Sequence, residues 1–433
     1  MRCLPVVVFV LCASCVSASA PVALPWLDDA SEPPSSGRSF VAVTYNLHSG
    51  LGGKPAWSVD AATARKHLAA MAATVASAAG DGLPDIVALN EIDFGSHRSG
   101  GIDEAVVVVD ELERLTGVRY QIHRLVTWTK EVPGDRMRYG SALLSRHPVR
   151  DVFTCSLVDG APCRAPQGGA RLPPLTVRSL PMKISGERRG VLRATLDIGG
   201  HEVDVVLSHL EAFDRGDREA QAAHLLARFV RPGRSVVLLG DMNSVPQSFP
   251  DRGWFDDDRT HDVLTSGSLV DARLAVLASD PSRSPASFAT FPSNDPVHAI
   301  DAVFASVDLV PVQALPIGGS ASDHLGLLAR FVRPEDAHSL AAAAARHDRM
   351  RGRQLHRLVQ EMDAAKGSRR GELARFLVDA TRFLEVASAE DRQRIVEALL
   401  VEEPGAPAAR DRKKKTLGFP RVCVVGELGF EPR

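Results

Sequence analysis

The sequence lacks several features that would assign a chain to a class at once. Its 433 residues carry a formal net charge of −2, so no overall basic field indicates nucleic-acid binding. No segment after the N-terminal apolar run predicts a transmembrane helix. No Cys/His spacing is typical of structural zinc, and the central region contains no internal repeat. These absences argue against a globally basic binder, an integral membrane protein and a zinc-stabilised module.

The N-terminus has the three-part layout of a secretory signal peptide. Arg2 precedes an apolar run from Leu4 to Cys12, and small residues follow at positions 18–20. The run is too short to span a bilayer as a mature helix. We therefore expect residues 1–20 to be a signal peptide, residues 21–37 to be a linker rich in Pro, Ser and Asp, and the mature protein to be secreted or periplasmic.

The cysteines agree with export. Cys155 and Cys163 could close a small loop in an oxidising compartment, whereas Cys423 has no obvious partner. A lipid anchor at Cys15 is a weaker alternative, because the residues before it make a poor lipoprotein box.

A buried strand that ends in polar residues stands at the centre of the sequence. Four apolar residues, 236–239, lead into Gly240, and Asp241 and Asn243 follow on alternate positions. Residues i and i+2 share a face in extended backbone, so the two side chains should project together. A simple turn is the alternative interpretation, since Gly, Asp and Asn all favour turns.

The same pattern recurs along the chain. Alternating or continuous apolar runs predict strands that end at polar residues, and helical spacing separates several of them. The polar residues at or near these strand ends are Asn46, Glu91, His209, Asp241, Asn243, Asp301, Asp323 and His324. Each could be an ordinary cap, pair or surface group. A layered α/β domain would nevertheless gather its strand ends at one rim, where carboxylates and amides could bind Mg²⁺, Mn²⁺ or Ca²⁺ and histidines could move protons.

The ordered motifs resemble a known family. They are Thr44-Tyr-Asn-Leu-His48, Leu89-Asn-Glu91, Ser208-His209-Leu210, Gly240-Asp-Met-Asn243, Ile300-Asp301 and Ser322-Asp323-His324. In order and spacing they are similar to the endonuclease/exonuclease/phosphatase superfamily of deoxyribonuclease-like, metal-dependent phosphohydrolases, over about residues 38–333. The resemblance implies a four-layered α/β sandwich, with two face-to-face β-sheets flanked by helices. Asn90 departs from the usual Gln before the glutamate but keeps an amide.

The resemblance also implies roles for the motif residues. Glu91 would be the principal Mg²⁺ ligand, helped by Asn46 and Asp323. Asp241 and Asn243 would lie beside the scissile phosphate, Asp301 would orient His324, and His209 would face the leaving or non-bridging oxygens. Whether Asp241 or the paired His324 and Asp301 activates the attacking water stays open.

Three further residues are weaker candidates for substrate binding. His48 lies two residues beyond Asn46 on the same face and could line the cleft, or could be an ordinary rim residue. Arg98 and Arg193 could contact substrate phosphate through their guanidinium groups. An ordinary salt bridge is the alternative for each arginine.

The region beyond residue 333 differs in character. Apolar residues at helical spacing predict three helices that form a small C-terminal appendage over residues 334–404. Residues 405–433 hold the basic cluster Lys413-Lys-Lys415 and are expected to be a disordered tail. We expect the appendage to be structural, without chemistry of its own.

The expected function is an exported, Mg²⁺-dependent phosphodiester hydrolase, first of all a nuclease that acts on nucleic acid. Residues 38–333 contain 31 Lys and Arg against 34 Asp and Glu, whereas a polyanion binder usually shows a basic surface. The alternative is a phosphatase or a phospholipase-C-like hydrolase of inositol phosphates or lipid head groups, which needs only a local positive pocket. A non-catalytic binding module is a remote third alternative.

Overall fold

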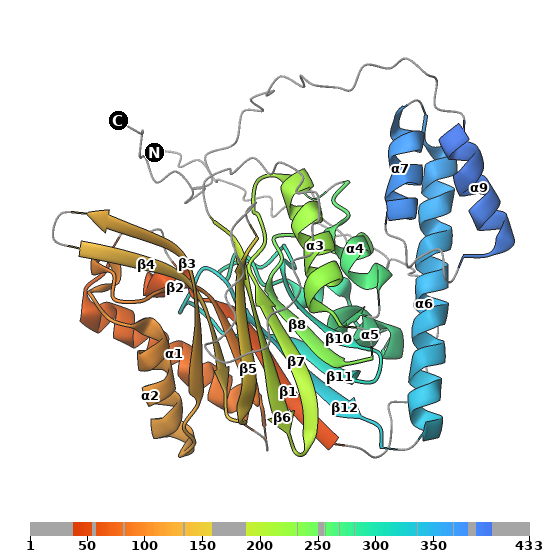
Figure 1. Cartoon of the computed structure of the whole chain (residues 1–433). Helices are drawn as coiled ribbons and strands as arrows, with labels where there is room; N and C mark the ends of the chain where they lie inside the picture. Colours follow the sequence, from red (N-terminus) through yellow and green to blue (C-terminus); the bar gives the residue numbers. More distant parts are fainter. Residues whose placement is uncertain are drawn as a thin grey trace, which may run out of the picture.

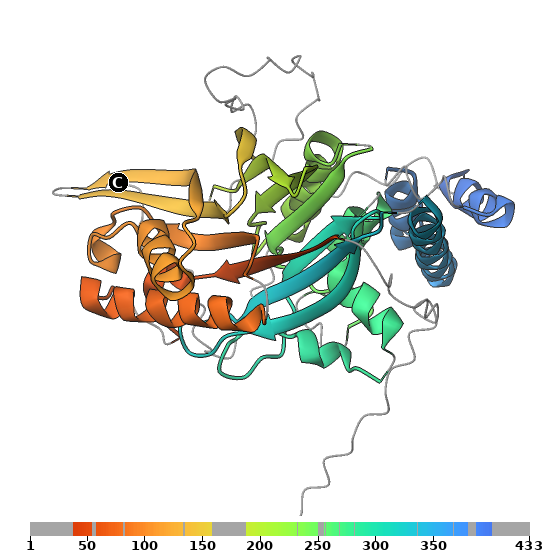
Figure 2. The ribbon, with the colours of Figure 1, turned by 90° about the horizontal axis from the view of Figure 1, so that it is seen from below.

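The computed structural model describes residues 38–53, 58–80, 83–132, 135–157, 188–231, 233–249, 255, 257–267, 269–280, 282–335, 337–366, 368–379 and 387–400. Two six-stranded sheets pack face to face, and helices cover their outer faces (Figures 1 and 2). This arrangement confirms the expected four-layered α/β sandwich. The expected signal peptide, linker and basic tail lie outside the described residues, as do Cys163 and Cys423.

Each sheet has a parallel pair of strands inside an otherwise antiparallel order. In spatial order the first sheet contains β11 (Val310–Ile317), β12 (Gly326–Arg333), β1 (Arg38–Asn46), β2 (Ile86–Asp93), β4 (Asp135–Ser145) and β3 (Gln121–Val132). The second contains β5 (Val149–Ser156), β6 (Gly190–Ile198), β7 (His201–Ser208), β8 (Ser235–Asp241), β10 (Asp301–Ser306) and β9 (Leu269–Asp271). The parallel pairs are β1 with β2 and β7 with β8.

Helical connections join the strands of each parallel pair, as parallel strands require. The helices of the sandwich are α1 (Ala61–Ala78), α2 (Glu104–Thr116), α3 (Arg215–Phe229), α4 (Thr260–Ser266) and α5 (Ala272–Ser279), with the short 3₁₀ turns η1 (His48–Gly50), η2 (His97–Ser99) and η4 (Pro285–Phe288). Helix α1 connects β1 to β2, and helix α3 connects β7 to β8. Asn46 at the end of β1 bonds Asp241 at the end of β8, so the carboxyl ends of the two parallel pairs lie toward one rim.

The core explains why the central strands read as continuous apolar runs. In β8, Val237 and Leu239 face the other sheet, whereas Val236 and Leu238 pack beneath α3 and α4. The first sheet packs in the same way, with its outer face under α1 and α2. A strand buried on both faces cannot alternate with polar residues, so only its ends can carry them.

Three further helices, α6 (Ala337–Ala364), α7 (Ser368–Asp379) and α9 (Ala389–Leu400), follow the last strand. They share a small apolar core of their own, which includes Leu355, Leu358, Leu373 and Ile395. Figure 1 shows them beside the sandwich, with α6 running along its flank. Among the described residues, no helix is both long and apolar enough to cross a membrane.

Candidate active site

Polar side chains from both sheets meet at the rim where the parallel strands end. Asn46 ends β1, Asp241 ends β8, and Asp301 begins β10 directly opposite Asp241 in the antiparallel ladder. His209 follows β7, and His324 precedes β12. The strand ends that the sequence singled out are therefore neighbours in space.

Asn46 ties the two sheets together. Its Nδ2 donates to Glu91 Oε1 at 3.0 Å and to Asp241 Oδ2 at 3.0 Å, and its Oδ1 accepts from the backbone N–H of His48 at 3.1 Å. The side chain is fully buried. In this orientation the amide presents its nitrogen, which cannot bind a cation, to the two carboxylates. Asn46 thus positions Glu91 and Asp241 here, and its role as a metal ligand stays a prediction of the resemblance.

Glu91 and Asn243 both occupy the left-handed backbone region, with φ of 53° and 47°. Glu91 sits at an irregularity in the β2–β4 ladder between Leu89 and Ile92, where a bulge re-aims the side chain. Asn243 is held by a hydrogen bond from its N–H to Asp241 Oδ1 at 2.9 Å. Such conformations persist only where the surroundings fix them, and they cluster at functional sites.

Asn90 fixes the backbone of Asp241 from the opposite sheet. Its Oδ1 accepts from the Asp241 N–H at 3.0 Å, while its Nδ2 donates to Ser141 Oγ at 3.0 Å. The sequence marked Asn90 only as a departure from the family pattern, and this bridging role was missed.

Burial, together with the nearby charge of Asp301, raises the pKa of Asp241 to about 7.

His324 and Asp301 form a buried pair. His324 Nδ1 lies 2.9 Å from Asp301 Oδ2, and His324 Nε2 lies 3.8 Å from Asp241 Oδ2. Burial alone would lower the pKa of His324, but the charge and hydrogen bond of Asp301 outweigh it and raise the pKa to about 10. The imidazole is therefore protonated at neutral pH and presents an N–H toward the cluster.

His209 is the opposite case. Its Nε2 lies 3.0 Å from Asn243 Nδ2, 3.6 Å from Asp241 Oδ2 and 4.0 Å from Glu91 Oε1. Burial and the guanidinium of Arg189 hold the pKa of His209 well below its ordinary value. A neutral ring accepts the hydrogen bond from Asn243, so two histidines at one rim hold opposite protonation states.

Arg189 is a site residue that sequence reasoning missed. Its Nη1 lies 3.0 Å from Nδ1 and 3.1 Å from Nε2 of His209, and the residue is 5% exposed. A shallow recess beside it is lined by Arg188, Arg189, His209 and Tyr139, among others. The sequence predicted a strand from Val191 but not its partner; the structure pairs Val191 with Ser208, so the residues just before it lie next to His209.

The remaining candidates lie at different distances from the cluster. His48 Nδ1 is 3.7 Å from Asp323 Oδ1 and 3.0 Å from the carbonyl of Gly52. Burial and the like charge of Glu91 raise the pKa of Asp323. Arg98 donates to both carboxylate oxygens of Asp93, at 2.7 and 2.9 Å, so its guanidinium supports the end of β2.

Arg193 is a predicted site residue that the structure places away from the cluster. It lies inside β6, opposite Val206 of β7 and below the rim, where its guanidinium is 3.2 Å from Asp151 Oδ2 and 5.5 Å from the ring centroid of Phe153. Alternation along β6 turns it away from the space between the sheets, which its neighbours Leu192 and Ala194 fill.

The acidic and histidine groups could hold a cation. Within the described residues, the ligand atoms of Glu91, His209 and Asp241 lie within 4.8 Å of one another, as do those of Asp241, Asp301 and His324. The pKa values of Asp241 and Asp323 are raised by burial and by neighbouring carboxylates. A divalent ion would relieve that repulsion, and oxygen donors suit Mg²⁺ or Ca²⁺, so the donor set fits such a cofactor.

Comparison with known proteins agrees with the motif pattern. A family described as "Endonuclease/Exonuclease/phosphatase family" matches residues 43–324. No curated protein matches the sequence. Similar solved structures include an endonuclease/exonuclease/phosphatase from Beutenbergia cavernae (21% identity, TM-score 0.46, covering 68% of this chain and 72% of that one). A family protein from Leptotrichia buccalis has 15% identity and a TM-score of 0.45, and the match covers 67% of this chain and 98% of that one. Truncated TDP2 from Caenorhabditis elegans has 18% identity and a TM-score of 0.41, with 68% of this chain and 97% of that one covered.

Proposed function

Because the chain belongs to the endonuclease/exonuclease/phosphatase family, we propose that it is an exported, Mg²⁺-dependent phosphodiester hydrolase that cleaves nucleic acid by in-line attack of water. The observation that carries the proposal is the meeting of Glu91, His209, Asp241 and the Asp301–His324 pair at one rim. These groups come from separate strands of two sheets. Ordinary helix caps or surface ion pairs would not bring them together at one place.

Glu91 and Asp323 are the residues proposed to hold the metal. Mg²⁺, or Mn²⁺ or Ca²⁺ in its place, would supply positive charge that stabilises the phosphorus centre and the departing oxygen. Asn46 keeps the Glu91 carboxylate in place through its 3.0 Å hydrogen bond. His48 lies beside the second carboxylate, with its Nδ1 3.7 Å from Asp323 Oδ1, and is proposed to line the cleft.

Asp241 is proposed as the general base. A base works best when its pKa is close to the working pH, and the pKa of Asp241 is raised to about 7. His324, whose pKa Asp301 raises to about 10, already carries its proton and is suited to donate to a phosphate oxygen instead. The difference in protonation state between Asp241 and His324 is what supports this choice of base.

The guanidinium of Arg189 forms the proposed contact with non-bridging phosphate oxygens. The neutral His209 can add only its Nδ1–H to this contact, because its Nε2 accepts from Asn243. Arg189 is a buried cation at the wall of the recess, and a guanidinium forks onto phosphate more effectively than an ammonium. Asn243 completes this wall, since its side chain bonds both His209 and the carbonyl of Leu210.

Export rests on two features. The N-terminal layout is that of a signal peptide. Cys155 is disulfide-bonded, and structural disulfides are typical of oxidising compartments.

A phosphatase or phospholipase-C-like activity on inositol phosphates or lipid head groups is the second candidate. The near balance of 31 basic and 34 acidic residues over residues 38–333 favours it. The charge of Arg98 is paired with that of Asp93, so Arg98 does not extend a basic surface away from the site. A small phosphate ester would not need such a surface. A non-catalytic module is the weakest alternative, because Asp241 and His324 have the raised pKa values that proton transfer would use.

The test is a substrate panel with the mature protein. Plasmid DNA, single-stranded DNA, RNA, sphingomyelin and inositol phosphates would be incubated with Mg²⁺ or with a chelator. His209→Ala is compared with His201→Ala, a histidine at the other end of the same strand that bonds Ser235. Cleavage of nucleic acid by the wild type and the His201 variant alone supports the proposal. Turnover of lipids or inositol phosphates only would select the second candidate, and no turnover would refute both.

A further inference from the structure

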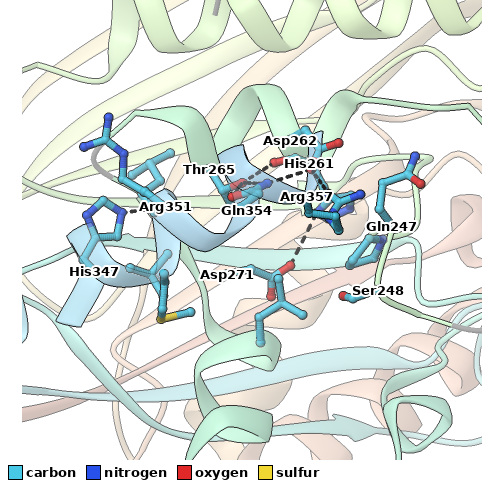
Figure 3. A pocket seen from close by; sticks show the side chains of 15 residues that line it. Gln247, Ser248, His261, Asp262, Thr265, Asp271, His347, Arg351, Gln354 and Arg357 are labelled. Atoms are coloured by element: carbon cyan, nitrogen blue, oxygen red, sulfur yellow. Dashed lines mark hydrogen bonds and ion pairs between the residues drawn. The ribbon is translucent and has the colours of Figure 1, made fainter. Parts of the chain in front are cut away.

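Helix α6 lies outside the family match, which stops at residue 324, yet it docks on the catalytic sandwich. Its apolar residues mostly pack against α7 and α9. Toward the sandwich, Met350 packs at the edge of the inter-sheet core, and a small hollow lies between α6 and the sandwich (Figure 3). Polar residues of both α6 and α4, among them Gln354, Arg357 and Asp262, line this hollow and contact one another across it.

Asp262 of α4 is the centre of these contacts. Gln354 Nε2 and Arg357 Nη2 of α6 donate to its Oδ1 at 2.7 and 3.0 Å, and Arg259 Nη1 donates to its Oδ2 at 3.2 Å. Figure 3 shows Gln354 against both Asp262 and Thr265. Burial would raise the pKa of Asp262, but the guanidinium groups of Arg357 and Arg259 outweigh it and hold the pKa below its ordinary value. The carboxylate is thus a buried, ionised anchor, 2% exposed.

The residue beside this anchor reaches the catalytic loop. His261 Nε2 lies 3.0 Å from the carbonyl oxygen of Ser244, and a carbonyl only accepts, so Nε2 carries the hydrogen. The other ring nitrogen lies 3.4 Å from Asp271 Oδ2, as the dashed line in Figure 3 marks. Ser244 directly follows Asn243, and its hydroxyl donates to Asp258 Oδ1 at 3.1 Å.

The loop needs such support because Asn243 is in the left-handed region, at φ 47°. A residue in that conformation stays there only when neighbouring contacts over-determine it. The bonds from Asn243 to Asp241 and His209 hold one side of the loop. The His261 ring holds the other side, and α4, from which it projects, is held in turn by α6.

We infer that Asp262 is a positioning residue: clamped by Gln354 and Arg357 of helix α6, it sets the first turn of α4 so that His261 holds the Asn243–Ser244 loop in its reactive conformation. The appended helix is thereby a working part of the active site rather than a passive appendage. The inference rests on the proposed function for its kinetic consequence and on the contacts alone for its structural one.

The experiment uses full-length protein and a matched pair of variants. The double variant Gln354→Ala/Arg357→Ala removes both α6 donors and leaves Asp262 its bond to Arg259. Arg346→Ala is the control, since Arg346 also joins α6 to the sandwich, at Ser279 Oγ (3.0 Å), but at a place with no contact to the loop. An activated phosphodiester, bis(p-nitrophenyl) phosphate, with Mg²⁺ gives kcat and KM, and hydrogen exchange reports on residues 242–249.

For the double variant we expect kcat to fall roughly tenfold with KM changed by less than about twofold, because a small misplacement of a catalytic group costs rate rather than binding. Exchange in residues 242–249 should accelerate, while the control keeps wild-type rates and exchange. His261→Gln, which retains a donor near Nε2, should keep more activity than His261→Leu. Equal effects in both α6 variants, or none in the double variant, would overturn the inference.

The two proposals fail separately. Absence of phosphodiesterase activity in the wild type would defeat the proposed function, whereas hydrogen exchange would still decide whether α6 holds the loop. Thermal unfolding of each variant identifies any that does not fold. If the double variant does not fold, the comparison of His261→Gln with His261→Leu decides whether the His261 ring holds the loop.

Discussion

The pairing of Asp301 with His324 leads to a sharp prediction for Asp301→Asn. A shift in the pKa of His324 from 6.5 to about 10 means that the site favours the imidazolium by roughly 5 kcal/mol over an ordinary environment. Asp301 is the largest cause that raises this pKa, and burial opposes it. Without the carboxylate charge, burial should bring the pKa of His324 down toward or below its ordinary value. At neutral pH the ring would then lose the proton that it is proposed to donate.

At a pH well above the lowered pKa of His324, the expected loss in kcat approaches roughly 10²- to 10⁴-fold, the usual contribution of a positioned proton donor. The assay is kcat against pH, between about pH 5.5 and 9.5, a window chosen because it spans the ordinary and the raised pKa of histidine. Asp308→Asn is the control, because Asp308 accepts from Ser306 Oγ at 2.6 Å at the far end of β10. Wild type should keep its activity at high pH, whereas the Asp301 variant should lose its remaining activity as pH rises through neutrality. A loss in kcat of about threefold or less, together with an unchanged pH profile, would be far below the contribution of a proton donor and would refute the assignment of His324.

The remaining predictions concern stability and binding. Gly240→Ala should lower the free energy of unfolding by on the order of 3 kcal/mol, because φ is 146° and an added Cβ would lie 1.8 Å from the Ser208 carbonyl oxygen; thermal unfolding measures it. Burial lowers the pKa of His347 to about 4, so the unfolded chain takes up a proton first as pH falls from about 6.5. His347 should therefore remove about 3 kcal/mol of stability by about pH 4, and His347→Gln should lose about that much less than the wild type in urea titrations. Arg189→Lys should raise KM more than it lowers kcat in the substrate assay, since a lysine cannot fork onto phosphate; the reverse ratio would assign Arg189 to the chemical step.

The layered architecture followed from the sequence because strands buried on both faces must read as apolar runs. Val236 to Leu239 fill both the inter-sheet core and the space under α3 and α4, and only Asp241 beyond them could be polar. The division into two sheets was different. Strand pairing between β8 and β10 depends on residues 60 positions apart, and periodicity carries no information about partners, so the resemblance supplied that part.

Individual site residues were predictable where the chain direction decides their place. Asn46 and Asp241 end parallel strands and Glu91 lies near the end of another, so within each sheet the direction of the strands brings these side chains toward one edge. Arg193 was placed wrongly at the cleft because its face depends on the register of β6, which its sequence does not reveal.

Side-chain orientation and long-range contacts were beyond the sequence. That Asn46 turns its nitrogen to the carboxylates depends on the His48 N–H, and that Asn90 braces Asp241 depends on the packing of one sheet on the other. The polar clamp of α6 on Asp262 likewise joins residues more than 90 positions apart. The helical periodicity of α6 predicted the helix but not the surface on which it docks.

The central claim is that metal-dependent phosphodiester cleavage takes place at the rim that holds Glu91. Single-turnover cleavage of end-labelled DNA, measured against Mg²⁺ concentration, tests it most directly in the wild type, in Glu91→Gln and in Glu202→Gln, a control at the opposite end of β7. We predict no cleavage in chelator, recovery with Mg²⁺, and a much higher Mg²⁺ requirement for the Glu91 variant alone. Cleavage that persists in chelator, or a Glu91 variant with the wild-type Mg²⁺ requirement, would contradict the account.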